Sequence, residues 1–191
     1  MKRKGRSRLG RPVAYGLASL AALNLALIAA HAGGLRINTT ASMPTGLYRL
    51  QRSETGAIAR GTVVAICPSP KVVAIAAARH YFEPGQCPGN VEPLLKHIAG
   101  MGGDTVEVTD RAVSVNGRPL PYSARLARDC AGRPLQHVRP GRYVLAPGMV
   151  WLYAPVARSW DSRYFGPQRA ADIIGLATPV LIVGSARACS A

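Results

Sequence analysis

A long uncharged apolar segment near the N-terminus constrains this chain most strongly. Residues 13–34 run for 22 positions without a formal charge, interrupted only by Asn24, His31 and a few small polar side chains. A helix rises about 1.5 Å per residue, so about 20 such residues cross the core of a bilayer. The segment is therefore long enough to form a membrane-spanning helix.

The basic residues around this segment indicate its orientation. Six of the 24 lysines and arginines lie in the first eleven positions, whereas Arg36 alone follows soon after the segment. The positive-inside rule then predicts a cytoplasmic N-terminus and an exported body. The densest block of basic residues is thus a topology signal, whereas residues 12–191 still carry a net charge of +9. A nucleic-acid-binding role is disfavoured because the later arginines are scattered.

Two other interpretations of the segment remain open. Ala30-His31-Ala32 resembles a signal-peptidase cleavage site, so the segment could be a cleavable signal peptide. A buried core helix of a soluble protein would leave the basic cluster without a purpose. We therefore expect a basic region over residues 1–12, an anchor or signal over 13–34, and an exported domain over 35–191, located at the cytoplasmic membrane or, after cleavage, in the periplasm.

The exported body has the pattern of a single, mostly β domain. Short β-branched runs alternate with Gly, Pro, Asn and Asp from Arg60 onward, as is typical of strands and turns. Val106 and Val108 flank a polar residue, as do Val113 and Val115, which predicts a hairpin turning at residues 109–111. The expected strands are Thr62–Ile66, Leu94–Ala99, Thr105–Val108, Ala112–Val115, Tyr143–Ala146, Val150–Tyr153 and Ile173–Val183.

The four cysteines suit an exported chain, because even numbers of cysteines usually pair in oxidising compartments. Cys67 and Cys87 bracket a Pro-bounded stretch in which Lys71–Tyr81 is expected to be a short helix. A disulfide closing this excursion is the pairing we expect, and the pairing of Cys130 and Cys189 stays open. No histidine spacing suits zinc, so we expect no metal and no cofactor.

Core packing alone does not explain three polar segments of the chain. They are S-M-P-T-G at residues 42–46, K-H-I-A-G-M-G-G-D at 96–104 and S-W-D-S-R-Y-F-G at 159–166. In this order they resemble the motifs of signal peptidase I, with Arg60-Gly61-Thr62-Val63-Val64 as a weaker fourth match. The resemblance implies an antiparallel β catalytic domain and a serine/lysine-dyad endopeptidase.

The resemblance also implies a role for each motif residue. Ser42 would be the nucleophile and Lys96 its general base, since burial of the amine lowers its pKa into the useful range. Asp161 is carried over with the catalytic set, Ser159 would orient the lysine, and Arg163 would pair with Asp161. Met43 supports the nucleophile, and Thr40 would help to bind the oxyanion, together with the Ser42 N–H.

The motifs of this chain differ from those of the housekeeping signal peptidase I, and the differences indicate a separate branch of that superfamily. The first motif lacks a spacer before proline, histidine follows the lysine, and the asparagine-rich stretch before the third motif is absent. This short form resembles the TraF-type peptidases of conjugative transfer, which implies an exported pilin precursor as partner and possible cyclisation of the product. The alternatives are a general signal peptidase I and a non-enzymatic exported component of a mating or secretion apparatus.

Overall fold

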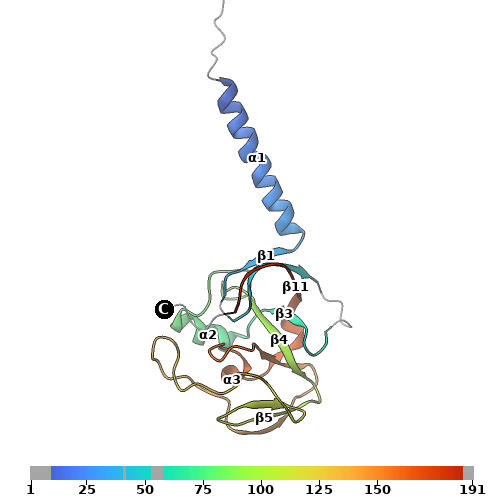
Figure 1. Ribbon diagram of the computed structural model, residues 1–191, viewed down its shortest axis with the longest axis vertical. Helices are drawn as coiled ribbons and strands as arrows, with labels where there is room; N and C mark the ends of the chain where they lie inside the picture. The colour runs from blue at the N-terminus through green and yellow to red at the C-terminus, as the bar shows by residue number, and fades with distance from the viewer. Residues whose placement is uncertain (1–9, 41, 53–57, 187–191) are drawn as a thin grey trace, which may run out of the picture. The chain divides into compact units, whose positions relative to one another are not determined.

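The computed structural model describes residues 10–40, 42–52 and 58–186, which fall into two compact units divided after Leu35. The first unit holds helix α1 (Gly10–Ala32) (Figure 1). Residues 12–32 of this helix are long and apolar enough to cross a membrane, by length and composition. The helix ends at a glycine pair, where Gly34 takes a φ of 82° that suits glycine. Most of the N-terminal basic cluster, residues 1–9, lies outside the described residues.

The second unit is mostly antiparallel β-structure, as the sequence predicted (Figure 1). The larger sheet has the order β1-β2-β11-β3-β4-β9-β10, with strands at Leu35–Asn38, Thr45–Gln51, Ile173–Gly184, Val63–Ile66, Leu94–Met101, Met149–Tyr153 and Gln168–Arg169. The smaller sheet has the order β7-β6-β5-β8, with strands at Arg118–Pro119, Val113–Val115, Thr105–Val108 and Gly141–Val144. The short helices are α2 (Pro70–Arg79), α3 (Ser162–Phe165) and a 3₁₀ turn (Ala170–Asp172).

Alternating burial along the strands builds the core. In β4, every second side chain from Leu94 onward is buried, because successive side chains point to opposite faces of a strand. One apolar cluster lies around β3, β4 and β9 and includes Val64, Ile98 and Leu152. A second cluster lies under the smaller sheet and includes Trp151 of β9. Strand β9 therefore contributes to both clusters.

Most sequence predictions of strands agree with the structure to within two residues. The hairpin at residues 109–111 is confirmed, since β5 pairs with β6 and the Thr109 N–H donates to the Ala112 carbonyl at 2.9 Å. The strand expected at Tyr143–Ala146 instead spans Gly141–Val144. Leu145 leaves that ladder because it is buried and exchanges backbone hydrogen bonds with Gly103 and Asp104.

The helix expected over Lys71–Tyr81 is α2, but it ends two residues earlier, at Arg79. His80 terminates it by taking a left-handed conformation with a φ of 54°. Strands β1 and β2, which frame the first motif, were not predicted. Their residues carry no clear alternation, and β2 is held by its antiparallel pairing with β11 from the far end of the chain.

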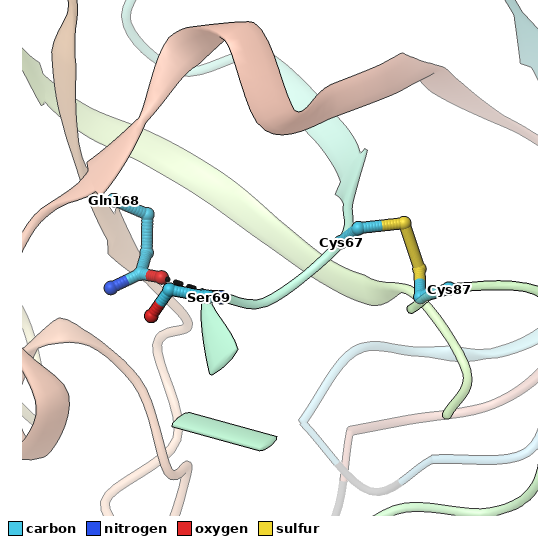
Figure 2. The surroundings of a disulfide bond; sticks show 4 residues. All are labelled: Cys67, Ser69, Cys87 and Gln168. Atoms are coloured by element: carbon cyan, nitrogen blue, oxygen red, sulfur yellow. Dashed lines mark hydrogen bonds between the residues drawn. A yellow bond between two sulfur atoms is a disulfide. The ribbon is translucent and has the colours of Figure 1, made fainter. Parts of the chain in front are cut away.

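The excursion that carries α2 is closed at its base by a disulfide. Cys67 and Cys87 are bonded, with their Cα atoms 5.4 Å apart, so the expected pairing is present (Figure 2). Near the same end, the backbone N–H of Ser69 donates to Gln168 Oε1 at 3.1 Å. Cys130 is also disulfide-bonded, whereas Cys189 lies outside the described residues. The disulfide therefore joins the two ends of the α2 excursion, and the Ser69 contact ties its first end to β10.

Candidate active site

The first motif forms the connection between β1 and β2, and Asn38 organises it. The Asn38 side chain is buried, and its Oδ1 accepts from the Thr40 N–H at 3.2 Å and from the Thr40 hydroxyl at 2.6 Å. Its Nδ2 donates to the carbonyls of Met43 and Pro44 at 3.3 and 3.0 Å. Ser42 thus lies, half-buried, in a loop that is held by side-chain-to-backbone hydrogen bonds.

The hydrogen bonds of this loop determine how the residues on either side of Ser42 are placed. The Thr40 hydroxyl donates its proton to Asn38, so in this conformation it is not directed at a substrate oxyanion. Met43 is buried and anchors the loop in the protein. Tyr48, at the far side of the loop, donates its hydroxyl proton to the Pro44 carbonyl at 2.8 Å. The oxyanion role of Thr40 therefore stays a prediction that requires rotation of its hydroxyl.

Lys96 lies on the buried face of β4, between β3 and β9. Only 3% of its surface is exposed, and His97 points to the other face, as strand alternation predicted. Burial lowers the pKa of Lys96 to about 8, and the charge of Arg163 acts in the same direction. The charges of Asp161 and Glu92 oppose this shift. The amine therefore has a substantial neutral fraction near pH 8, which an exposed lysine would not have.

The third motif begins in the loop after β9 with a buried serine. Ser159 is 2% exposed, and its hydroxyl has no hydrogen-bond partner among the described residues. A buried hydroxyl that is left without a partner costs free energy, so such groups tend to mark sites that another molecule completes. The sequence alone did not reveal this property of Ser159.

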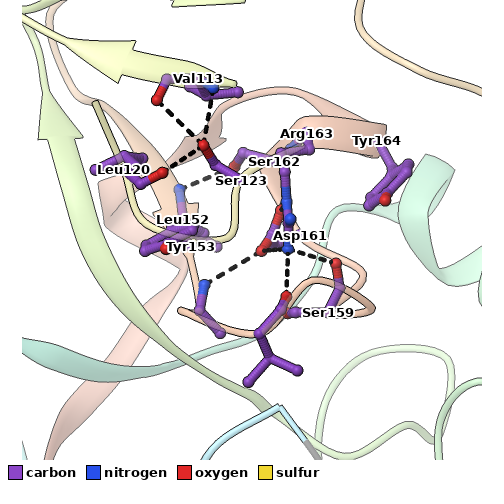
Figure 3. A network of polar contacts seen from close by, with 12 residues as sticks. Val113, Leu120, Ser123, Leu152, Tyr153, Ser159, Asp161, Ser162, Arg163 and Tyr164 are labelled. Atoms are coloured by element: carbon purple, nitrogen blue, oxygen red, sulfur yellow. Dashed lines mark hydrogen bonds and ion pairs between the residues drawn. The ribbon is translucent and has the colours of Figure 1, made fainter. Parts of the chain in front are cut away.

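Asp161 and Arg163 form a fully buried ion pair beneath that loop (Figure 3). The guanidinium donates to both carboxylate oxygens of Asp161, at 2.8 and 2.9 Å. It also donates to the carbonyl oxygens of Val156 and Ser159, at 2.9 Å each. The pairing expected from the sequence is thus present, and it holds the backbone of the Ser159 loop.

One cleft of about 490 Å³ brings three of the motif segments together. Ser42, Lys96 and Ser159 all line it, together with Thr40. Met43, Asp161 and Arg163 do not line it. Asp161 therefore lies outside the lining of the cleft, and its place in the catalytic set stays a prediction.

Two disulfide-bonded segments form the remaining walls of the cleft. The segment after α2 contributes Tyr81, and the loop that contains Cys130 contributes Asp129. The Tyr81 hydroxyl donates to Asp129 Oδ2 at 2.6 Å, and Arg79 and Arg133 form ion pairs with the same carboxylate. This cluster ties the two walls together. It was missed from the sequence, because 48 positions separate Tyr81 from Asp129.

The fourth, weaker motif lies beside the second one. Arg60 forms an ion pair with Asp104, which ends the lysine motif and is buried. Asn116 Nδ2 and the Met101 N–H also donate to that carboxylate, each at 2.8 Å. The Arg60 guanidinium holds the pKa of Asp104 well below its usual range. These contacts fix the end of β4, the strand that carries Lys96.

Comparisons with known proteins give a family match and several similar conjugal transfer proteins. Residues 12–182 match the family model described as signal peptidase, peptidase S26. The chain is 42% identical over 179 residues to a probable conjugal transfer protein TraF of Sinorhizobium fredii, covering 92% of this chain and 93% of that protein. It is 38% identical to a plasmid transfer protein TraF of Escherichia coli, covering 80% of this chain and 86% of that protein.

A solved structure of signal peptidase I from Enterococcus faecalis is also similar, at 22% identity and a TM-score of 0.36, covering 68% of this chain and 99% of that chain. The fold assignment rests on the strands described above. The family match covers both the apolar helix and most of the β unit. The chain belongs to the signal peptidase family, peptidase S26.

Proposed function

We propose that this peptidase is a membrane-associated serine endopeptidase in which Lys96 activates Ser42, and that it matures the pilin precursor of a conjugative transfer system. The observation that carries the proposal is the burial of Lys96 in the cleft that Ser42 also lines. A serine hydroxyl is a poor nucleophile until a nearby base removes its proton. A lysine whose pKa lies near 8 suits that role.

In this proposal, each step of the reaction is assigned to a residue of the cleft. Neutral Lys96 accepts the Ser42 proton as Oγ attacks the scissile carbonyl carbon, and the resulting ammonium returns a proton to the leaving amine. The Ser42 N–H and a rotated Thr40 hydroxyl stabilise the oxyanion. Ser159 lines the same cleft as Lys96, and its hydroxyl, which lacks a partner among the described residues, orients the Lys96 amine once substrate fills the cleft. Water or a substrate amino group then attacks the acyl-enzyme ester and frees Ser42.

The apolar surfaces of the chain support action at a membrane. Helix α1 is long enough to cross a bilayer, and β1 begins at Leu35, three residues after the helix ends. In β11, residues 178–183 are exposed on both faces, and Val180–Val183 are all apolar. Exposed apolar runs of this kind are unusual on soluble monomers. With the basic N-terminus in the cytoplasm, the cleft acts on the exported side.

Rates should depend on the protonation of Lys96. We expect kcat/KM to rise as the pH increases through about 8, because only the neutral amine accepts the serine proton and the protonated form predominates below this pH. A pH profile of kcat/KM with a fluorogenic peptide measures this. A flat profile from about pH 6 to about pH 9 would contradict the role of Lys96 as general base.

The names of the TraF relatives support the conjugative substrate, and deletion of the gene tests it. In cells that carry the transfer system, the pilin precursor should accumulate while other exported proteins mature normally, and the wild-type gene, but not Ser42→Ala, should restore processing. Accumulation of many precursors would indicate a general signal peptidase instead. Normal processing by Ser42→Ala would indicate a non-enzymatic component.

The product of the reaction has its own test. If the pilin's amino group attacks the acyl-enzyme, the mature pilin should be cyclic and its mass should be lower by one water than that of the linear product. Intact-mass spectrometry distinguishes the two. A pilin with the linear mass would refute cyclisation and leave the endopeptidase proposal unchanged.

A further inference from the structure

The carboxylates of the chain divide into two groups. All five described aspartates form ion pairs with arginine: Asp104, Asp110, Asp129, Asp161 and Asp172. The described glutamates, Glu83, Glu92 and Glu107, form none. Glu83 and Glu92 both line the cleft that holds Ser42 and Lys96. In a chain with far more basic than acidic residues, two glutamates without an ion-pair partner in one cleft require an explanation.

The backbone holds these two glutamates side by side. The Glu92 N–H donates to the Glu83 carbonyl at 2.9 Å, and the Gly85 N–H donates to the Asn90 carbonyl at 3.2 Å. A Cβ atom at Gly85 would lie 2.4 Å from the Cα of Glu92, so only glycine permits this close approach. The disulfide at Cys87 closes the same loop. The fold thus brings two like charges together.

The electrostatic setting of Glu92 shows the consequence. Burial raises the pKa of Glu92, and the charge of Glu83 acts in the same direction. The Glu83 backbone N–H and the charge of Lys96 oppose this only in part. Like charges held close together are unfavourable unless a counter-charge is present. A positive group of a bound molecule would relieve that repulsion.

The other cations of the cleft do not supply this counter-charge. Arg79 and Arg133 form ion pairs with Asp129. Arg128 donates to the Gly132 carbonyl at 2.6 Å, and Arg158 is exposed and forms no ion pair among the described residues. Independently of these charges, the buried Ser159 hydroxyl in the same cleft lacks a partner among the described residues. Both observations indicate that the cleft is completed by a polar ligand.

We propose that Glu83 and Glu92 form a subsite for a cationic group of the polypeptide substrate, which is a lysine or arginine side chain or an α-ammonium group near the scissile bond. The inference rests on the proposed function only in that this cleft binds the substrate. A bound cation would also offset the Glu92 charge, which otherwise favours the protonated form of Lys96. Substrate binding would thereby increase the fraction of neutral base.

Binding of matched peptides to the full-length Ser42→Ala protein in detergent micelles tests the subsite without catalysis. The probes are short fluorescein-labelled alanine-rich peptides that carry one lysine, or norleucine at the same position, with a free or acetylated amino end. We expect one cationic probe to bind about tenfold more tightly than its neutral match. If the subsite binds a side chain, the lysine peptide should bind more tightly than the norleucine peptide. If it binds an α-ammonium group, the peptide with a free amino end should bind more tightly than the acetylated one.

Substitution then assigns the preference to residues. Glu92→Gln and Glu83→Gln together should abolish the tenfold preference, whereas Glu107→Gln, on the smaller sheet, should retain it. Equal binding of all charged and neutral probes, or a preference that survives the double substitution, would overturn the subsite. Cleavage by the wild-type protein is measured separately. If the protein binds cationic peptides more tightly but cleaves none, the peptidase mechanism is refuted and the subsite is not.

Discussion

Replacement of Lys96 with methionine is expected to lower kcat/KM for a cleavable peptide by about a thousandfold, within the range for loss of a general base. Methionine fills a similar volume on the buried face of β4 without an amine. The fold should therefore persist, because an apolar side chain replaces a buried polar one. Steady-state kinetics with the full-length protein measures the loss.

Two further variants isolate the dyad from a general effect. Lys71→Met changes the other described lysine, which is exposed on α2, and should leave kcat/KM unchanged. Ser42→Ala should cost about as much as Lys96→Met, and the double variant should be little worse, because residues that act as a unit are not additive. If Lys96→Met retained most of the wild-type rate, another base would have to serve Ser42.

Replacement of Asp161 with alanine should destabilise the β unit by about 3–5 kcal/mol, the range for removing one partner of a buried ion pair. Arg163 would remain fully buried without its counter-charge. The backbone N–H of Ala154, at the end of β9, would also lose the Asp161 carboxylate as an acceptor. Urea unfolding of the full-length protein in detergent, followed by Trp fluorescence, measures the change.

A second measurement separates positioning from mere stability. The Asp161 charge favours the ammonium form of Lys96, so any folded Asp161→Ala protein should reach its maximal kcat/KM at a lower pH than the wild type. Asp172→Ala removes a carboxylate whose partner Arg169 is largely exposed. It should change neither the free energy of unfolding nor the pH of maximal kcat/KM by much. An unchanged unfolding free energy for Asp161→Ala would contradict the structural role of the pair.

The parts of the fold that were predictable from sequence have local signals. The apolar helix is visible as a continuous run, and the β5–β6 hairpin as two alternating runs around Thr109. The Cys67–Cys87 bond was predictable because the two cysteines bracket one excursion. Each of these features depends on residues that are close in the chain, so a short window of sequence contains the physical cause.

The parts that were missed depend on distant partners. Strand β2 alternates poorly and forms because β11 pairs with it from the other end of the chain. Asn38 is an ordinary loop residue in sequence, although an asparagine before a polar run is a weak signal for an Asx turn. The Tyr81–Asp129 contact that joins the walls of the cleft has no local signal at all.

The sequence by itself determined the apolar span, the mostly β body and the motif residues that identify the family, because these features depend on local composition, periodicity and the order of motifs. Only the tertiary structure decided that Lys96 is buried, that Ser159 lacks a partner among the described residues and that Asp161 lies beside the cleft instead of in it. It also decided that Glu83 and Glu92 face the same cleft. Burial and neighbouring charges depend on which distant segments cover a side chain, and these lower the pKa of Lys96 to about 8.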